Sequence, residues 1–188
     1  MGITYKFCSY IDSLLGVSYS EKYLDLVALG QIADMVDLKA FETKHLIQKG
    51  LKKVSNPYFE KMVEKNSYQL GKGLTPIGIA FYVAPYINAM IRTGDMYEKT
   101  ILFEAMLNYK AHEMIPSTKR GEKGKEEELV EQACRTCTNV KNKQTKMRDE
   151  ALQKIEALIE QKSLLNNKVL VIKLDENLSF SFYHFTPP

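Results

Sequence analysis

The sequence lacks any apolar run near the ~20 residues that a membrane-spanning helix needs. Its first residues are too polar for a signal peptide. An excess of one charge is also lacking, since 26 Lys and Arg oppose 23 Asp and Glu, so net charge does not argue for a nucleic-acid partner. Three cysteines, an odd number, do not make a disulfide framework and are typical of a reducing compartment. We therefore expect a cytoplasmic protein without a membrane segment.

Helical periodicity dominates the first two-thirds of the 188 residues. The composition, 45% hydrophobic and 26% charged, is that of a soluble globular protein and excludes a disordered tail or a collagen-like fibre. Apolar residues at helical spacing, with Gly and Pro between segments, predict helices over 6–15, 20–38, 41–54 and 96–109, a short helix or turn over 57–64, and an apolar element over 77–91.

A long helix is predicted over 126–161, which contains no Gly or Pro. Its apolar residues recur every three or four positions in one narrow stripe, with Gln144 filling the one gap: Ala133, Cys137, Val140, Met147, Ala151, Ile155 and Leu158. Such a stripe suits a connector laid across a domain, or half of a helix pair. The period then changes to two over 168–174, and a second strand is expected over 178–185. The expected fold is therefore mainly α with a short C-terminal β-hairpin or strand.

Three aspartates lie in the most informative window, 24–38, which is apolar around nearly its whole circumference. A helix of this kind should be buried, and a buried carboxylate is costly unless it is paired, hydrogen-bonded or bound to a metal. Asp25 and Asp34 are nine residues apart and fall on opposite faces of a helix, whereas Asp34 and Asp37 share a face. Spacing leaves two interpretations of Asp34: a buried cap or salt-bridge partner, or a metal ligand.

The same window carries a family resemblance. Residues 24–36, Leu-Asp-Leu-Val-Ala-Leu-Gly-Gln-Ile-Ala-Asp-Met-Val, resemble the late motif of RecJ-type single-strand DNA exonucleases in the DHH phosphoesterase superfamily. The resemblance implies that Asp34 is a ligand of a catalytic Mn²⁺ or Mg²⁺, since hard divalent cations take carboxylate oxygens. The chain departs from the motif at Gln31, where the family tends to have Thr, and at Asp37, where it tends to have Pro. Asp37 matches no family ligand.

Further stretches continue the resemblance in order. Residues 2–6 and 44–51 resemble the family segments G-V-A-Y-K and R-x-L-V-x-x-G-L, and residues 85–94 resemble P-R-I-N-A-A-G-R-x-G. Asn88 and Arg92 are four residues apart, so on a helix they share a face and suit a scissile phosphate or the DNA backbone. Tyr86 stands at the first Arg of the motif, where it could stack on a base. The alternative is structural: Asn88 caps a helix and Arg92 bridges an acid.

The resemblance extends from residue 2 to about residue 174 and predicts the domain organisation. It divides the chain into the C-terminal helical part of a DHH-type α/β catalytic domain (1–115), a long connector helix (116–166) and the truncated start of the DHH-associated domain (167–188). The first three family motifs supply most metal-binding aspartates and the paired histidines, and they have no counterpart here. No Asp-His-His occurs, and His45, His112 and His184 stand apart. We therefore expect about a third of such an exonuclease.

A basic stretch without acids occupies 132–148 of the long helix. It predicts either phosphate contacts with single-stranded DNA, which weaken as salt rises, or a solvated face balanced by acids just upstream. Its cations are Arg135, Lys141, Lys143, Lys146 and Arg148. Cys134 and Cys137 have C-x-x-C spacing, but the sequence holds no second such pair. Both lie near the apolar stripe, which favours a role in core packing over zinc binding or redox chemistry.

Two functions from different classes follow. The resemblance implies a partial 5′→3′ single-strand DNA exonuclease of repair and recombination, in which two metal ions activate water and Asp34 is one ligand. The alternative is a non-catalytic helical module that binds nucleic acid or a partner protein, which the missing motifs favour for the chain acting alone. A separate chain that supplies those motifs is a third arrangement. Single-stranded DNA and Mn²⁺ or Mg²⁺ are the expected partner and cofactor.

Overall fold

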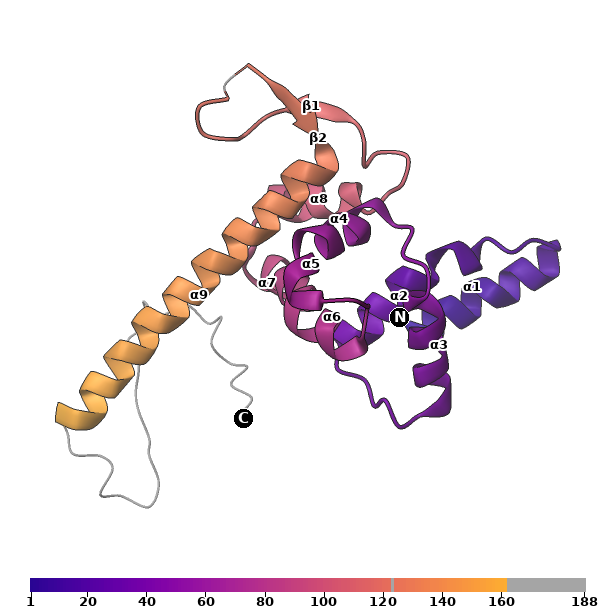
Figure 1. Ribbon diagram of the computed structural model, residues 1–188, viewed down its shortest axis with the longest axis horizontal. Coiled ribbons are helices and arrows are strands. Elements are labelled where there is room, and N and C mark those ends of the chain that lie inside the picture. Colours follow the sequence, from indigo (N-terminus) through magenta and orange to yellow (C-terminus); the bar gives the residue numbers. More distant parts are fainter. Residues whose placement is uncertain (123, 162–188) are drawn as a thin grey trace.

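The fold is mainly α, as expected, in a computed structural model that describes residues 1–122 and 124–161 (Figure 1). The N-terminal elements are α1 (Gly2–Leu15), the 3₁₀ helix η1 (Ser20–Tyr23), α2 (Leu24–Ala33) and α3 (Phe41–Leu51). They are followed by α4 (Pro57–Lys65), α5 (Ser67–Leu70), α6 (Pro76–Tyr82), α7 (Ala84–Thr93), α8 (Met96–Ala105), β1 (Met114–Pro116), β2 (Glu126–Glu128) and α9 (Leu129–Gln161). The strands expected over 168–185 lie outside the described residues.

A single large core joins most of these helices. The largest fully buried side chains include Tyr58, Phe59 and Met62, which place one face of α4 in the centre of the core. Burial of such side chains stabilises the fold by about 1.5–3 kcal/mol each. Asn56 caps the N-terminus of α4, since its side chain accepts a hydrogen bond from the backbone N–H of Phe59, and Pro57 suits the first helical position. The short α4 is therefore a central element of the fold.

The helix expected over 20–38 is shorter in the structure. Residues 20–23 form η1, and α2 ends at Ala33 because Met35 adopts a left-handed conformation with φ 51°. α2 and α3 approach closely at Gly50, where a Cβ atom would lie 2.2 Å from the Leu24 carbonyl oxygen. The close approach explains why this pair needs glycine at the crossing.

Two helices occupy the apolar element expected over 77–91. α6 begins where Thr75 Oγ1 accepts a hydrogen bond from the Gly78 N–H at 3.0 Å. Pro85 lies in the first turn of α7, where a missing N–H is harmless but continuation of α6 is not possible. The next helix, α8, begins with a reciprocal capping box between Asp95 and Glu98.

The long helix is confirmed, but it begins at Leu129 instead of Glu126. Residues 126–128 pair as β2 with β1 in an antiparallel register that sets Met114 opposite Glu128. The first half of α9 packs against α4, α7 and α8, and its second half extends beyond them (Figure 1). Its first half is therefore laid across the other helices, which is the first of the two arrangements that the narrow stripe allowed. Among the described helices, none is long and apolar enough to cross a membrane.

Candidate metal and nucleic-acid site

Asp34 lies in an exposed turn at the end of α2. Its backbone N–H donates to the Gly30 carbonyl at 3.0 Å, and Met35 then turns the chain away. The expected burial of this carboxylate is wrong, and so is the shared helix face of Asp34 and Asp37, because the helix ends at Ala33. The acid is therefore open to a ligand.

The buried carboxylate of this window is Asp25 instead. It is 2% exposed, and its Oδ2 atom accepts hydrogen bonds from the backbone N–H groups of Ser55 and Asn56 at 2.8 and 2.7 Å. Its Oδ1 atom accepts from the N–H of Leu26 at 2.8 Å. These contacts tie α2 to the start of α4, so Asp25 has a structural role and lies apart from Asp34.

A pocket of about 290 Å³ opens beside Asp34, between the first turns of α1 and α3 and the end of α2. Its oxygen-bearing side chains are Gln31, Asp34, Glu42 and Thr43. Gln31 is 6% exposed, and its Oε1 atom has no hydrogen-bond partner among the described residues. Glu42 is paired with Lys6 at 2.6 Å. Gln31 lies one helical turn before Asp34, whereas no local sequence pattern places Glu42 beside them, because α3 reaches this pocket only through its packing on α2.

These donors fit part of a divalent-cation site. Carboxylate and amide oxygens are ligands that Mg²⁺ and Mn²⁺ prefer. The buried Gln31 Oε1 atom has no hydrogen-bond partner among the described residues, so it is available to a ligand. Within residues 1–122 and 124–161, however, no three His, Cys, Asp or Glu side chains gather closely enough to hold a metal. Asp34 therefore stands as a single exposed carboxylate at this pocket, and its role as a metal ligand stays a prediction.

Asn88 brings the second motif to the same place. Its Nδ2 atom donates to the Ala33 carbonyl oxygen at 3.4 Å, so α7 is fastened to the residue that precedes Asp34. The two positions are 55 residues apart in the sequence. Because Ala33 is the last residue of α2, Asn88 caps the end of this helix, as its structural alternative predicted, and the two motifs adjoin there.

Arg92 lies one helical turn beyond Asn88 on α7 and is exposed. It makes no ion pair or hydrogen bond to another side chain in the described part of the chain. The acid bridge that was its structural alternative is thus not formed there. Tyr86 is half-buried against the core, so only part of its ring is open to a base.

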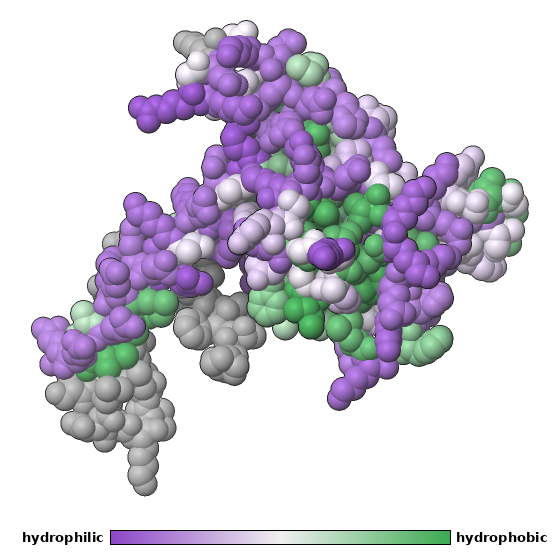
Figure 2. All heavy atoms as spheres, in the orientation of Figure 1, coloured by the Kyte–Doolittle hydropathy of each residue, from purple (hydrophilic) through white to green (hydrophobic). Residues whose placement is uncertain are grey.

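The basic stretch on α9 divides into two parts. Lys143 and Lys146 are exposed, Lys146 lies 3.9 Å from Glu150, and Arg148 pairs with Asp149 at 2.8 Å. Lys141 is half-buried, and its pKa is lowered by burial and then by the neighbouring charge of Arg148. These four cations lie near the middle of α9, which spans residues 129–161, and Figure 2 shows both hydrophilic and hydrophobic residues along the projecting part of this helix.

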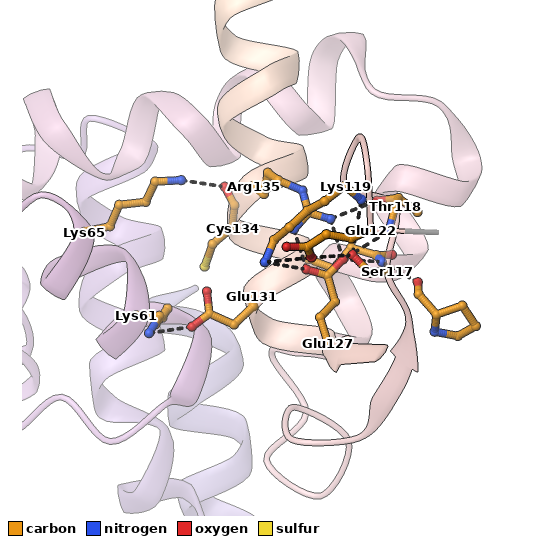
Figure 3. Close-up of polar contacts among 12 residues, drawn as sticks. Lys61, Lys65, Ser117, Thr118, Lys119, Glu122, Glu127, Glu131, Cys134 and Arg135 are labelled. Atoms are coloured by element: carbon orange, nitrogen blue, oxygen red, sulfur yellow. Dashed lines mark hydrogen bonds and ion pairs between the residues drawn. The ribbon is translucent and has the colours of Figure 1, made fainter. Parts of the chain in front are cut away.

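Arg135 does not belong to that group. Both of its terminal nitrogens donate to the buried carboxylate of Glu127, which also accepts from Gln132 at 3.0 Å and from the Thr118 N–H at 3.2 Å (Figure 3). The Arg135 guanidinium holds the pKa of Glu127 well below its usual range. Arg135 therefore fastens the β1–β2 hairpin to α9.

A cleft of about 380 Å³ lies beside this network, between α4, α9 and the loop that follows β1. Lys61 contacts Glu131 at 2.6 Å (Figure 3) and Glu64 at 3.1 Å, and these carboxylates raise its pKa. Lys65 donates to Thr138 at 2.8 Å. Lys61 and Lys65 of α4 therefore bind side chains of α9 across the cleft, and these contacts hold the two helices together. No sequence pattern marks it, since its lining comes from three separate segments.

The two cysteines of the C-x-x-C segment are core residues, as predicted. Cys134 and Cys137 are buried, and Cys137 Sγ lies 3.2 Å from the Tyr58 hydroxyl. Burial raises the pKa of Cys134 to about 12 and that of Cys137 to about 11. Neither thiol is poised as a thiolate ligand or nucleophile.

The geometry can be set beside known proteins. No family model and no solved structure matches the chain. Two curated relatives do: the SPbeta prophage-derived single-strand DNA-specific exonuclease YorK of Bacillus subtilis strain 168, and the single-strand DNA-specific exonuclease of Bacillus phage SPbeta, both provisionally named. Each is 38% identical over 177 residues, which are 93% of this chain. The chain spans 30% of the length of these relatives and is similar to that part of them.

Proposed function

We propose that this chain is part of a metal-dependent single-strand DNA exonuclease of the RecJ type, acting 5′→3′ in repair or recombination with Mn²⁺ or Mg²⁺. The observation that carries the proposal is the hydrogen bond from Asn88 to the Ala33 carbonyl. It holds α7, which bears the exposed Arg92, next to the exposed Asp34. The similarity to provisionally named single-strand DNA exonucleases supports the substrate class.

Each residue has a role in the proposed site. A divalent cation, when bound, stabilises the negative charge that develops on the phosphate during hydrolysis. The Asp34 carboxylate contributes one oxygen ligand to the cation, and Gln31 lines the same pocket. Arg92, exposed and without an acidic partner in the described part, binds phosphate oxygens, and Asn88 holds α7 beside Asp34. Tyr86 offers a partly exposed ring for stacking.

The complete site needs ligands beyond those described. One free carboxylate cannot hold a two-metal centre, so the missing motifs must come from further polypeptide, either covalently joined or a separate chain. Without it, the chain acts as a helical module that binds single-stranded DNA through α9. We expect the purified 188-residue chain to bind oligo-dT but to show no Mn²⁺-dependent hydrolysis.

A hybrid protein tests the proposal. In it, residues of this chain replace the matched segment of the SPbeta relative, which is measured in parallel. We expect the hybrid to release the label of 5′-labelled single strands as a short product with Mn²⁺, and Asp34→Asn to abolish hydrolysis. Asp37→Asn, an exposed acid in the next turn, is the matched control and should retain activity.

Three results would contradict the proposal in whole or in part. A folded hybrid that leaves DNA intact while the relative degrades it would remove the activity from this chain. A hybrid in which Asp34→Asn and Asp37→Asn are equally active would remove Asp34 from the site. Release from 3′ ends only would overturn the polarity.

A further inference from the structure

Helix α1 contacts the rest of the fold through its polar side. Its least exposed positions, Gly2, Tyr5, Ser9 and Asp12, recur every three or four residues and face η1 and α2. Asp12 Oδ2 accepts a hydrogen bond from the Ser20 N–H at 2.6 Å, and Ser9 lies 3.0 Å from the Ser20 hydroxyl. Tyr5 on the same side packs against Leu24, Val27 and Leu46, so this side of the helix is occupied by contacts within the fold.

The opposite side of α1 is apolar and faces outward. Ile3, Phe7, Tyr10 and Leu14 follow one another at steps of four, three and four residues and are 86%, 63%, 63% and 67% exposed. With Ile11 and Leu15 they span an arc of about 140°, interrupted by Thr4 alone. Figure 1 shows α1 extending away from the other helices, so no described element covers this arc. An amphipathic helix normally turns this face toward a core.

Neither a second copy nor a single coiled-coil helix fits the arc well. α1 has 14 residues and is about 21 Å long, so two copies pairing through it would bury less than the ~1,200 Å² of a stable interface. The arc is also wider than the narrow seam of a two-helix coiled coil. A folded surface that surrounds the helix matches its shape better.

The relatives contain such additional polypeptide. The matched segment makes up 30% of their length, and the rest has no counterpart among the described residues. We propose that the outward face of α1 is the docking surface for the polypeptide that corresponds to this remaining part, which buries Phe7 and its neighbours. The inference rests on the proposed function and names where the site-completing polypeptide attaches.

Cys8 reports on this surface, because it is exposed and lies at the edge of the arc while Cys134 and Cys137 are buried. Maleimide labelling of Cys8, followed by mass spectrometry of its peptide, is compared between the 188-residue chain and the hybrid with the SPbeta relative. We expect labelling in the hybrid to be at least tenfold slower. Where the hybrid does not melt cooperatively, the relative without its matched segment is added in trans for the same comparison.

Phe7→Glu should restore rapid labelling of Cys8 and lower the melting temperature of the hybrid. Phe103→Glu is the matched control, because Phe103 is 65% exposed on α8 and Phe7 is 63% exposed on α1. Equal labelling in chain and hybrid, equal effects of the two variants, or a defined dimer of the chain in which Cys8 is protected would each overturn the proposal. A hybrid in which Cys8 is protected but DNA is not degraded would support this docking surface and contradict the proposed exonuclease function instead.

Discussion

At the scale of single residues, the two acids of the α2 segment have separate tasks. Asp25 is enclosed and hydrogen-bonded to three backbone N–H groups, whereas Asp34 is exposed at a turn. A carboxylate that satisfies buried donors stabilises the fold, and one that faces solvent is available for a ligand. The two positions are therefore expected to respond differently to substitution.

Asp25→Ala should lower the free energy of unfolding by about 3 kcal/mol, because it leaves the buried N–H of Asn56 and the partly buried N–H of Ser55 without an acceptor. Urea denaturation at neutral pH measures the change. Asp34→Ala, at an exposed position, should change stability by less than about 0.5 kcal/mol. Equal losses at both positions would refute the structural role of Asp25.

Glu127→Gln should remove a pH-dependent part of the stability. The folded pKa of Glu127 lies below its ordinary value of 4.5, so its stabilisation is present above about pH 4.5 and is lost as pH falls through the folded pKa. We expect the variant to be about 2 kcal/mol less stable at pH 7 and to lose less stability between pH 5 and pH 3. Thermal melts across this range measure the difference, with the exposed Glu126→Gln as control. If the melting temperatures of the parent and of Glu127→Gln fell equally between pH 5 and pH 3, the pH-dependent role of Glu127 would be contradicted.

At the scale of elements, the crossing of α2 and α3 depends on a missing side chain. Gly50→Ala should destabilise the protein by about 2 kcal/mol, because its Cβ would lie 2.2 Å from the Leu24 carbonyl oxygen and 2.7 Å from Ala28 Cβ. This cost exceeds the ~1 kcal/mol that alanine gains in helix propensity. Gly73→Ala has open space around it and should be nearly neutral. Chemical denaturation measures the free energy of unfolding of both variants. A Gly50→Ala variant that is more stable than the parent would disprove the close approach of α2 and α3.

The basic segment 141–148 of α9 is expected to bind phosphates. Replacing its four outer cations by Gln should flatten the salt dependence of oligo-dT binding by roughly 0.7 per lost contact, with helix content unchanged. Fluorescence anisotropy from low to moderate salt measures this slope. The substituted residues are Lys141, Lys143, Lys146 and Arg148, and the charge-matched control substitutes Lys39, Lys52, Lys53 and Lys72. An unchanged slope in the α9 variant would make the stretch a solvated helix face.

At the scale of the whole molecule, the exposed apolar surface is large for a monomer. α1 turns its apolar side outward, and Phe41, Phe81 and Phe103 are also well exposed. Surfaces of this kind drive association when their partner is absent. We expect the 188-residue chain to bind the dye ANS and to associate without fixed stoichiometry, and the hybrid to do neither. Light scattering after size-exclusion chromatography measures this, and a monodisperse chain with a sharp melt would oppose it.

Local patterns by themselves determined most of the helices. Apolar spacing located α3, α4, α8 and the body of α9, and it identified Cys134 and Cys137 as core residues. It succeeded because a helix carries its own periodicity in consecutive residues. The division of the chain at residues 115 and 166 stays a prediction, as do the roles of Asp34, Asn88 and Arg92.

Only the tertiary structure decided which residues meet. It separated Asp25 from Asp34, brought Asn88 to the end of α2, and took Arg135 out of the basic stretch by pairing it with Glu127. It also showed that α1 rests on its polar side. Periodicity shows that a helix has an apolar face, but the partner of that face is set by contacts between segments far apart in the sequence. Those contacts have no local signature, and so the site and the docking surface emerge only in the folded chain.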